Sequence, residues 1–239
     1  MARKRHPRLE ALEATAPTLS PQIYIRIKND PEIRTYLQLA DEHTAAIGYT
    51  EHGLRHATLV AANAAYILSA LGYDQEKVEL ARIAGFLHDI GNMMGRDTHP
   101  QMGAVLCYQL LSRFGLTPRQ RGMVMSAVGN HEEGSGQPVN EVSAAVIIAD
   151  KSDVHRTRVR EWDEGTDDIH DRVNYACVRA ELNVSAKERS IELNLIIDTN
   201  IASLLDYFEI FTERMVMCKT AARFIGCEFY LVINGVRLG

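Results

Sequence analysis

Cysteine is scarce in this chain of 239 residues, which has only four, and no two of them stand in a C-x-x-C spacing. That pattern excludes a zinc knuckle or a redox dithiol. Long apolar runs are also missing, since no uninterrupted stretch reaches the roughly 20 residues that a membrane helix needs. The basic residues at the start of the sequence are not followed by the apolar segment of a secretory signal. We therefore expect a cytoplasmic protein with no membrane partner.

An excess of positive charge is lacking as well. The chain has 31 acidic and 26 basic residues, a net charge of -5 and a sequence pI near 6.0. This balance argues against nucleic acid as a partner, because the phosphate backbone attracts strongly basic surfaces. Hydrophobic residues make up 46% of the sequence, which is enough to fill the core of one large domain or of a medium domain and a small one.

Apolar residues recur at spacings of three and four over most of the first 160 positions, which predicts amphipathic helices. His88 and Asp89 fall in the last turn of the third predicted helix, and Asn140 is the expected cap of the last one. The expected helices are 21 to about 47, 52–71, 75–91, a segment that begins at 99, 119–128 and 142–149.

Beyond residue 160 the hydrophobic period changes from 3.6 to 2. Two alternating segments, 176–184 and 191–197, predict an antiparallel hairpin. A long amphipathic helix over 201–225 and a last strand over 227–233 follow. The sequence thus predicts a mostly α fold: a flexible basic arm over 1–20, a helical bundle over 21–160, and a small α+β (β-β-α-β) unit over 161–239. Such a small sheet has exposed edges, so docking onto the helical domain or homodimerisation is a hypothesis for this unit.

Four residues of metal-ligand type lie at the ends or inner faces of the predicted helices: His56, His88, Asp89 and Asp150. Imidazole and carboxylate groups hold divalent cations while leaving positions open to water. A helical bundle can direct such side chains at one core site, and their burial without a cation would leave costly unsatisfied groups. A lone His-Asp pair is more often a hydrogen-bonded histidine beside a helix-end carboxylate, so the prediction depends on the whole set.

Three stretches of this sequence resemble the HD superfamily of metal-dependent phosphohydrolases: HGLRHATLVAANA, AGFLHDIGN and VIIADKSD. The resemblance implies an HD-type helical domain in which His56, His88, Asp89 and Asp150 bind one divalent ion. Two further stretches, THPQMGAVL and NHEEGSGQP, resemble the two-metal branch that includes the HD-GYP phosphodiesterases. That likeness implies a second ion held by His99 and His131, with Asp89 bridging the two ions as the central catalytic residue.

This chain departs from the HD-GYP pattern at Asn92, where that pattern has lysine, and at Asn130, where it has histidine. The first departure removes a cation that could meet substrate phosphate, and the second argues against a third metal ion. Both weaken cyclic dinucleotide cleavage as the specific activity.

Four more residues are candidate substrate contacts: His52, Asn92, Arg96 and Lys151. His52 stands four positions before His56 and would share a helical face with it. The alternatives are a helix-entry residue for His52 and a solvated loop side chain for Arg96. Asp153 could orient a ligand histidine from behind.

The leading functional prediction is a metal-dependent phosphohydrolase that cleaves a nucleotide or another small phosphorylated metabolite with a metal-activated water. One or two divalent ions are expected, from the set Mn, Fe, Co, Ni, Zn and Mg, because histidine with carboxylate does not select among them. Two alternatives stay open: a non-catalytic sensor that binds metal and nucleotide, and a di-iron oxygenase of HD fold.

Overall fold

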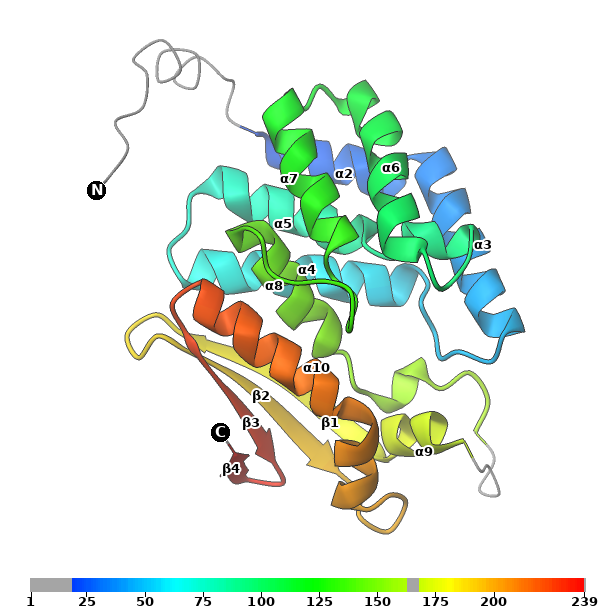
Figure 1. Ribbon diagram of the computed structural model, residues 1–239, viewed down its shortest axis with the longest axis vertical. Helices are drawn as coiled ribbons and strands as arrows, with labels where there is room; N and C mark the ends of the chain where they lie inside the picture. The colour runs from blue at the N-terminus through cyan, green and yellow to red at the C-terminus, as the bar shows by residue number, and fades with distance from the viewer. Residues whose placement is uncertain (1–18, 163–167, 239) are drawn as a thin grey trace.

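The computed structural model describes residues 19–162 and 168–238, and the predicted basic arm over 1–20 lies almost entirely outside these residues. A helical region comes first and a four-stranded sheet follows near the C-terminus (Figure 1). The helices are α2 Pro21–Asn29, α3 Pro31–Ala46, α4 Leu54–Ala70, α5 Gln75–Leu87, α6 His99–Leu111, α7 Pro118–Gly129, α8 Glu141–Lys151, α9 Ile169–Ala176 and α10 Leu204–Phe224, with short 3-10 turns η1 Ile90–Met93, η2 Ser112–Phe114 and η3 Arg156–Arg158.

Polar caps set several helix starts. Asp30 accepts hydrogen bonds from the backbone N–H groups of Glu32 and Ile33, and Pro31 occupies the first turn of α3. The predicted single helix over 21–47 is therefore two helices, because this proline and its cap begin a new one. Asn140 caps α8 as predicted, in a reciprocal pair with Ser143.

The region around the His-Asp pair differs slightly from the prediction. The helix α5 ends at Leu87, His88 is its C-cap, and Asp89 precedes the 3-10 turn η1. Gly91 is required in this turn: an added Cβ would lie 2.0 Å from the carbonyl oxygen of His99. The absence of a side chain thus lets η1 approach the start of α6 closely and brings Asp89 near His99.

The helices α4, α5 and α8 pack together around a continuous apolar core. Gly85 lets α5 approach α4, since a Cβ there would lie 2.9 Å from the carbonyl oxygen of Val60. No helix in the described part of the chain is long and apolar enough to cross a membrane.

The sheet consists of β1 Cys177–Ser185, β2 Ser190–Ile197, β3 Glu228–Ile233 and β4 Val236–Leu238, in that order. The predicted hairpin is β1–β2, which is antiparallel; β3 pairs parallel to β2, and β4 pairs antiparallel to β3. The short elements α9 and β4 were not predicted. Figure 1 shows α10 between the sheet and the helical region, where it contacts α8 on one side and β2 and β3 on the other.

Candidate metal centre

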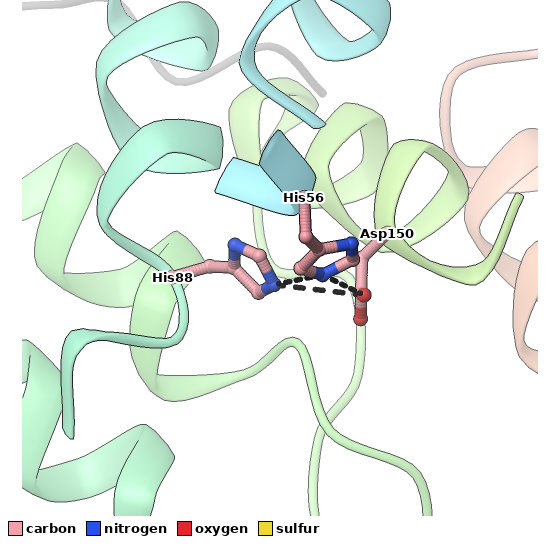
Figure 2. A group of neighbouring side chains, drawn as sticks. All are labelled: His56, His88 and Asp150. Carbon is pink, nitrogen blue, oxygen red and sulfur yellow. Dashed lines mark hydrogen bonds and ion pairs between the residues drawn. The ribbon is translucent and has the colours of Figure 1, made fainter. Parts of the chain in front are cut away.

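Three side chains from separate helices meet in a first group: His56 of α4, His88 at the end of α5 and Asp150 of α8. His56 Nε2 lies 3.1 Å from His88 Nε2 and 3.2 Å from Asp150 Oδ1. His88 Nε2 lies 3.5 Å from the same carboxylate oxygen. Figure 2 shows the two rings and the carboxylate facing one another, and all three residues are buried. The structure therefore places these three predicted residues within ligand distance of one another.

A second group lies beside the first and consists of His99, His131 and Glu132. His99 begins α6, and His131 follows the end of α7. Their Nε2 atoms are 3.1 Å apart, and His99 Nε2 lies 3.8 Å from Glu132 Oε2. Together with Asp89, the two groups offer four imidazoles and three carboxylates.

Asp89 stands between the two groups, with one carboxylate oxygen toward each. Its Oδ2 lies 3.3 Å from His88 Nε2 and 3.6 Å from His56 Nε2. Its Oδ1 lies 3.4 Å from His99 Nε2 and 3.6 Å from His131 Nε2. A carboxylate in this position could bridge two cations, one through each oxygen.

All four imidazoles are oriented in the same way, with Nδ1 bonded away from the centre and Nε2 facing it. The Nδ1 acceptors are the Gly85 carbonyl for His88 (2.8 Å), the Arg96 carbonyl for His99 (2.7 Å), the Val128 carbonyl for His131 (2.6 Å) and the Asp153 carboxylate for His56 (2.7 Å). A carbonyl oxygen can only accept, so each of those three Nδ1 atoms carries a proton. When a ring with this Nδ1 proton is neutral, its Nε2 lone pair points into the centre.

Lone pairs and carboxylate oxygens that face one another within 4 Å repel unless positive charge lies among them. Burial opposes protonation of His88, yet the carboxylates of Asp89 and Asp150 outweigh it and raise the pKa of His88 to about 10. The centre therefore favours a positively charged group at this point. The donor set of imidazoles and carboxylates fits a divalent ion of the borderline or hard class.

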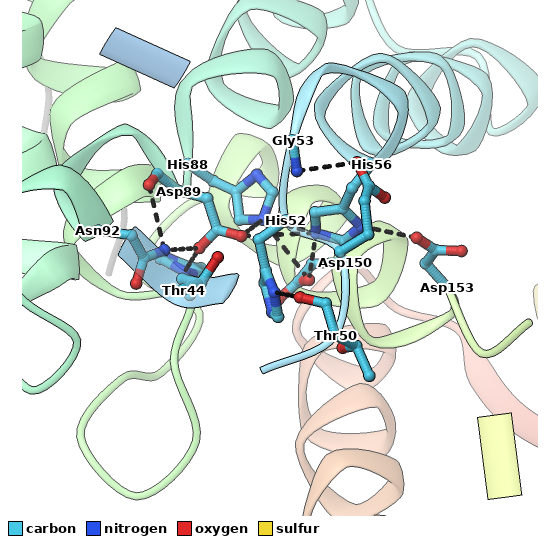
Figure 3. Close-up of polar contacts among 12 residues, drawn as sticks. Thr44, Thr50, His52, Gly53, His56, His88, Asp89, Asn92, Asp150 and Asp153 are labelled. Carbon is cyan, nitrogen blue, oxygen red and sulfur yellow. Dashed lines mark hydrogen bonds and ion pairs between the residues drawn. The ribbon is translucent and has the colours of Figure 1, made fainter. Parts of the chain in front are cut away.

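Asp153 supports the first group from behind. Its carboxylate accepts a hydrogen bond from His56 (Figure 3). It also contacts Arg55 Nη2 at 2.9 Å and Arg158 Nη1 at 3.7 Å. Burial raises the pKa of this carboxyl, but the His56 hydrogen bond and the Arg158 charge outweigh it, so the pKa lies well below its ordinary value. An ionised Asp153 fixes the orientation of the His56 ring.

His52 occupies a different place from the predicted one. It precedes α4, whose N-cap is Gly53, so it does not share a helical face with His56. Its Nδ1 donates to the Thr50 carbonyl, and its Nε2 accepts a hydrogen bond from Arg158 Nη2 at 3.0 Å. With both ring nitrogens engaged, His52 offers no free ligand atom, although Figure 3 shows it beside Asp89 and Asp150.

Two other predicted substrate contacts, Asn92 and Lys151, contact carboxylates of the centre. The amide of Asn92 is buried and donates to Asp89 Oδ1 at 2.8 Å. Lys151 is also buried, and its ammonium lies 2.7 Å from Asp150 Oδ2 and 2.9 Å from Glu133 Oε2. Both residues orient or neutralise carboxylates of the centre in this geometry.

Arg96 lies at the edge of the second group. Its Nη2 is 2.6 Å from Glu132 Oε1, its Nη1 is 3.2 Å from His99 Nε2, and its guanidinium lies over the Tyr49 ring. Three residues of the site were not predicted from the sequence: Glu132, Arg55 and Arg158. Glu132 and Arg55 could have been found, because Glu132 directly follows His131 in the NHEE stretch and Arg55 directly precedes His56 in HGLRHATLVAANA, whereas Arg158 lies outside the quoted stretches.

Much of this chain is similar in sequence to known proteins. Residues 53–157 match the family model of the HD domain. An uncharacterized protein of Methanocaldococcus jannaschii is 24% identical over 216 residues, which cover 81% of this chain and 82% of the relative. Ribonuclease Y of Streptococcus agalactiae is 29% identical over 143 residues, which cover 59% of this chain but only 22% of the ribonuclease.

Among solved structures, a predicted HD superfamily hydrolase from an uncultured Thermotogales bacterium matches 52% of this chain and 70% of its own length. The two are 25% identical, with a TM-score of 0.40. The family match concerns the HD domain as a whole, so the resemblance to the two-metal HD-GYP branch stays a prediction.

Proposed function

We propose, from the match of residues 53–157 to the HD domain, that this chain is a metal-dependent phosphohydrolase acting on a nucleotide or another small phosphorylated metabolite. The observation that supports this most directly is the carboxylate of Asp89, whose two oxygens face two separate groups of imidazoles. The ligand set that we propose for one ion is His56, His88, Asp89 and Asp150. For a second ion we propose Asp89, His99 and His131, with Glu132 as a further donor.

When bound, a pair of divalent ions in such a centre supplies an activated water and neutralises charge on the phosphoryl oxygens. The residues of the chain orient the proposed ligand atoms. The Nδ1 hydrogen bonds hold the four rings with their lone pairs inward, and Asn92 holds the Asp89 carboxylate with one oxygen toward each group. Arg96, beside His99, is the cation that we propose to meet the substrate phosphate.

A phosphoester as the bond that is cleaved agrees with the name of one relative, a ribonuclease, although that match covers a small part of the ribonuclease. The excess of acidic residues in this chain argues for a small substrate rather than a long nucleic acid.

The test combines metal analysis with a substrate panel. Protein purified without added metal is analysed for bound elements and then assayed with an aryl phosphate, an aryl phosphodiester, nucleotides and short RNA. We expect Asp89→Ala to lose activity and bound metal, while Asp97→Ala, at an exposed position of the neighbouring loop, keeps both. Asp89→Ala with undiminished activity would refute the catalytic assignment.

The same preparation separates the alternatives. Nucleotide binding measured by calorimetry without any turnover would favour a sensor. Bound iron with oxygen consumption in the presence of an organic substrate would favour an oxygenase.

A further inference from the structure

A cavity of about 330 Å³ lies beside the metal centre and is enclosed by two parts of the chain. The helical region contributes residues 47–50, His52 and Arg96, and the C-terminal unit contributes residues of α9 and α10, among them Arg214. Arg96 lies between the metal centre and the cavity, because its Nη1 contacts His99 Nε2 while the side chain lines the cavity. Cavities that hold small ligands begin at about this volume.

The two arginines that line the cavity are held in the same way. Arg96 pairs with Glu132 and lies over the Tyr49 ring; Arg214 pairs with Glu133, Nε to Oε1 at 2.8 Å, and lies over the Phe211 ring. Each guanidinium is thus fixed by one carboxylate and one aromatic face. Among the described residues, the Glu133 contact is the only ion pair of Arg214, which leaves its Nη groups able to bind an anion.

The position of Arg214 matters because it is on α10, outside the matched HD domain. Arg96 is close enough to the centre to meet the phosphate that reacts, whereas Arg214 is joined to the centre through Glu133 and Lys151. A fixed cation in the cavity, apart from the reacting group, suits a second anionic group on the same ligand.

We propose that Arg214 determines specificity for substrates that carry a second anionic group beyond the phosphate that is cleaved, such as a nucleoside diphosphate. The α9 wall of the cavity, with Asp171, His170 and Asn174, then faces the hydroxyl or amino groups of the organic part. This inference rests on the proposed function for the reacting phosphate, but the binding step stands apart from turnover.

The test is calorimetric binding of ADP and AMP to the metal-loaded 239-residue protein and to three variants of it. Arg214→Gln removes the cation, Arg214→Lys keeps the charge without the planar fork, and Arg223→Gln removes an exposed cation of the same helix that does not line the cavity. Thermal melts of all four proteins establish that each one is folded.

We expect the parent to bind ADP more tightly than AMP, and Arg214→Gln to weaken ADP binding by about tenfold or more, the scale of a hydrogen bond to a charged group. AMP binding should change much less, Arg214→Lys should recover part of the loss, and Arg223→Gln should match the parent. Equal binding of ADP and AMP by the parent, or an equal loss of both in Arg214→Gln, would overturn the inference. Arg214-dependent ADP binding without hydrolysis would count against the proposed function alone.

Discussion

Asp153 offers the sharpest test of how the centre is supported, because among the described residues His56 is the proposed metal ligand that its side chain contacts. We consider Asp153→Asn, which keeps the size of the side chain and one acceptor oxygen but removes its charge. The His56 Nδ1 hydrogen bond of 2.7 Å and the Arg55 contact of 2.9 Å both lose their ionised acceptor. Arg158, which is 3% exposed, loses its carboxylate partner.

Two effects follow, and each has its own magnitude. Loss of a carboxylate that orients a ligand histidine lowers metal affinity by about 10- to 100-fold. Breaking a buried ion pair by removing one partner costs about 3 kcal/mol or more, since Arg158 would be left buried without its counter-ion. For a chain of this length that cost lowers the melting temperature by about 6 to 12 °C.

The assay measures both quantities on the same preparations. Metal affinity is obtained by competition with a chromogenic chelator, and thermal stability by circular dichroism of the metal-free protein. The control is Glu188→Gln, at an exposed position of the β1–β2 turn, which should change neither quantity. If Asp153→Asn binds metal as tightly as the parent and melts at the same temperature, the support that we assign to Asp153 does not exist.

Three other perturbations have expected outcomes. Gly91→Ala should destabilise the protein and lower its metal content, because the added Cβ would lie 2.0 Å from the His99 carbonyl oxygen and 2.6 Å from the Gly103 nitrogen; urea unfolding and elemental analysis measure the two effects, and Gly122→Ala, where the space is open, is the control. Removal of metal by a chelator should lower the melting temperature of the parent, since a ligand that binds only the folded state stabilises it; an unchanged melting curve would mean that no ion holds the helices together. Asp41 is partly buried, which opposes its ionisation, but hydrogen bonds from Arg160 and from the His52 N–H outweigh this and lower its pKa. The ionised form therefore adds stability above the unfolded pKa of about 4, and this stability is lost as the pH falls through the lower folded pKa. The difference in free energy of unfolding between the parent and Asp41→Asn should therefore become smaller in acid. A difference that grows in acid would contradict the assignment.

The helices were largely predictable because their signals are local. Apolar spacing and caps such as Asn140 marked the helical region, and the change of period marked the hairpin β1–β2. The short α9 and β4 were missed because they contain too few residues for a period to emerge. The break at Pro31 carries a local signal in its Asp-Pro pair, although the apolar pattern continues on both sides of it.

The contacts of the centre were only partly predictable. His56, His88, Asp89 and Asp150 could be selected because each stands in a recognisable stretch. The engagement of Lys151 by Glu133 and of His52 by Arg158 depends on how distant segments pack, and no local pattern encodes that. The role of Arg214 in enclosing the cavity is likewise a property of the folded chain.

The first group of ligands joins α4, α5 and α8, so its members are separated by much of the helical region. Contacts between distant parts of a chain form late, because closing a long loop costs entropy before the contact can repay it. During synthesis, a nascent chain that has not yet exposed α8 lacks one arm of the first site. Binding of an ion by this group would therefore require that α8 has already packed against α4 and α5.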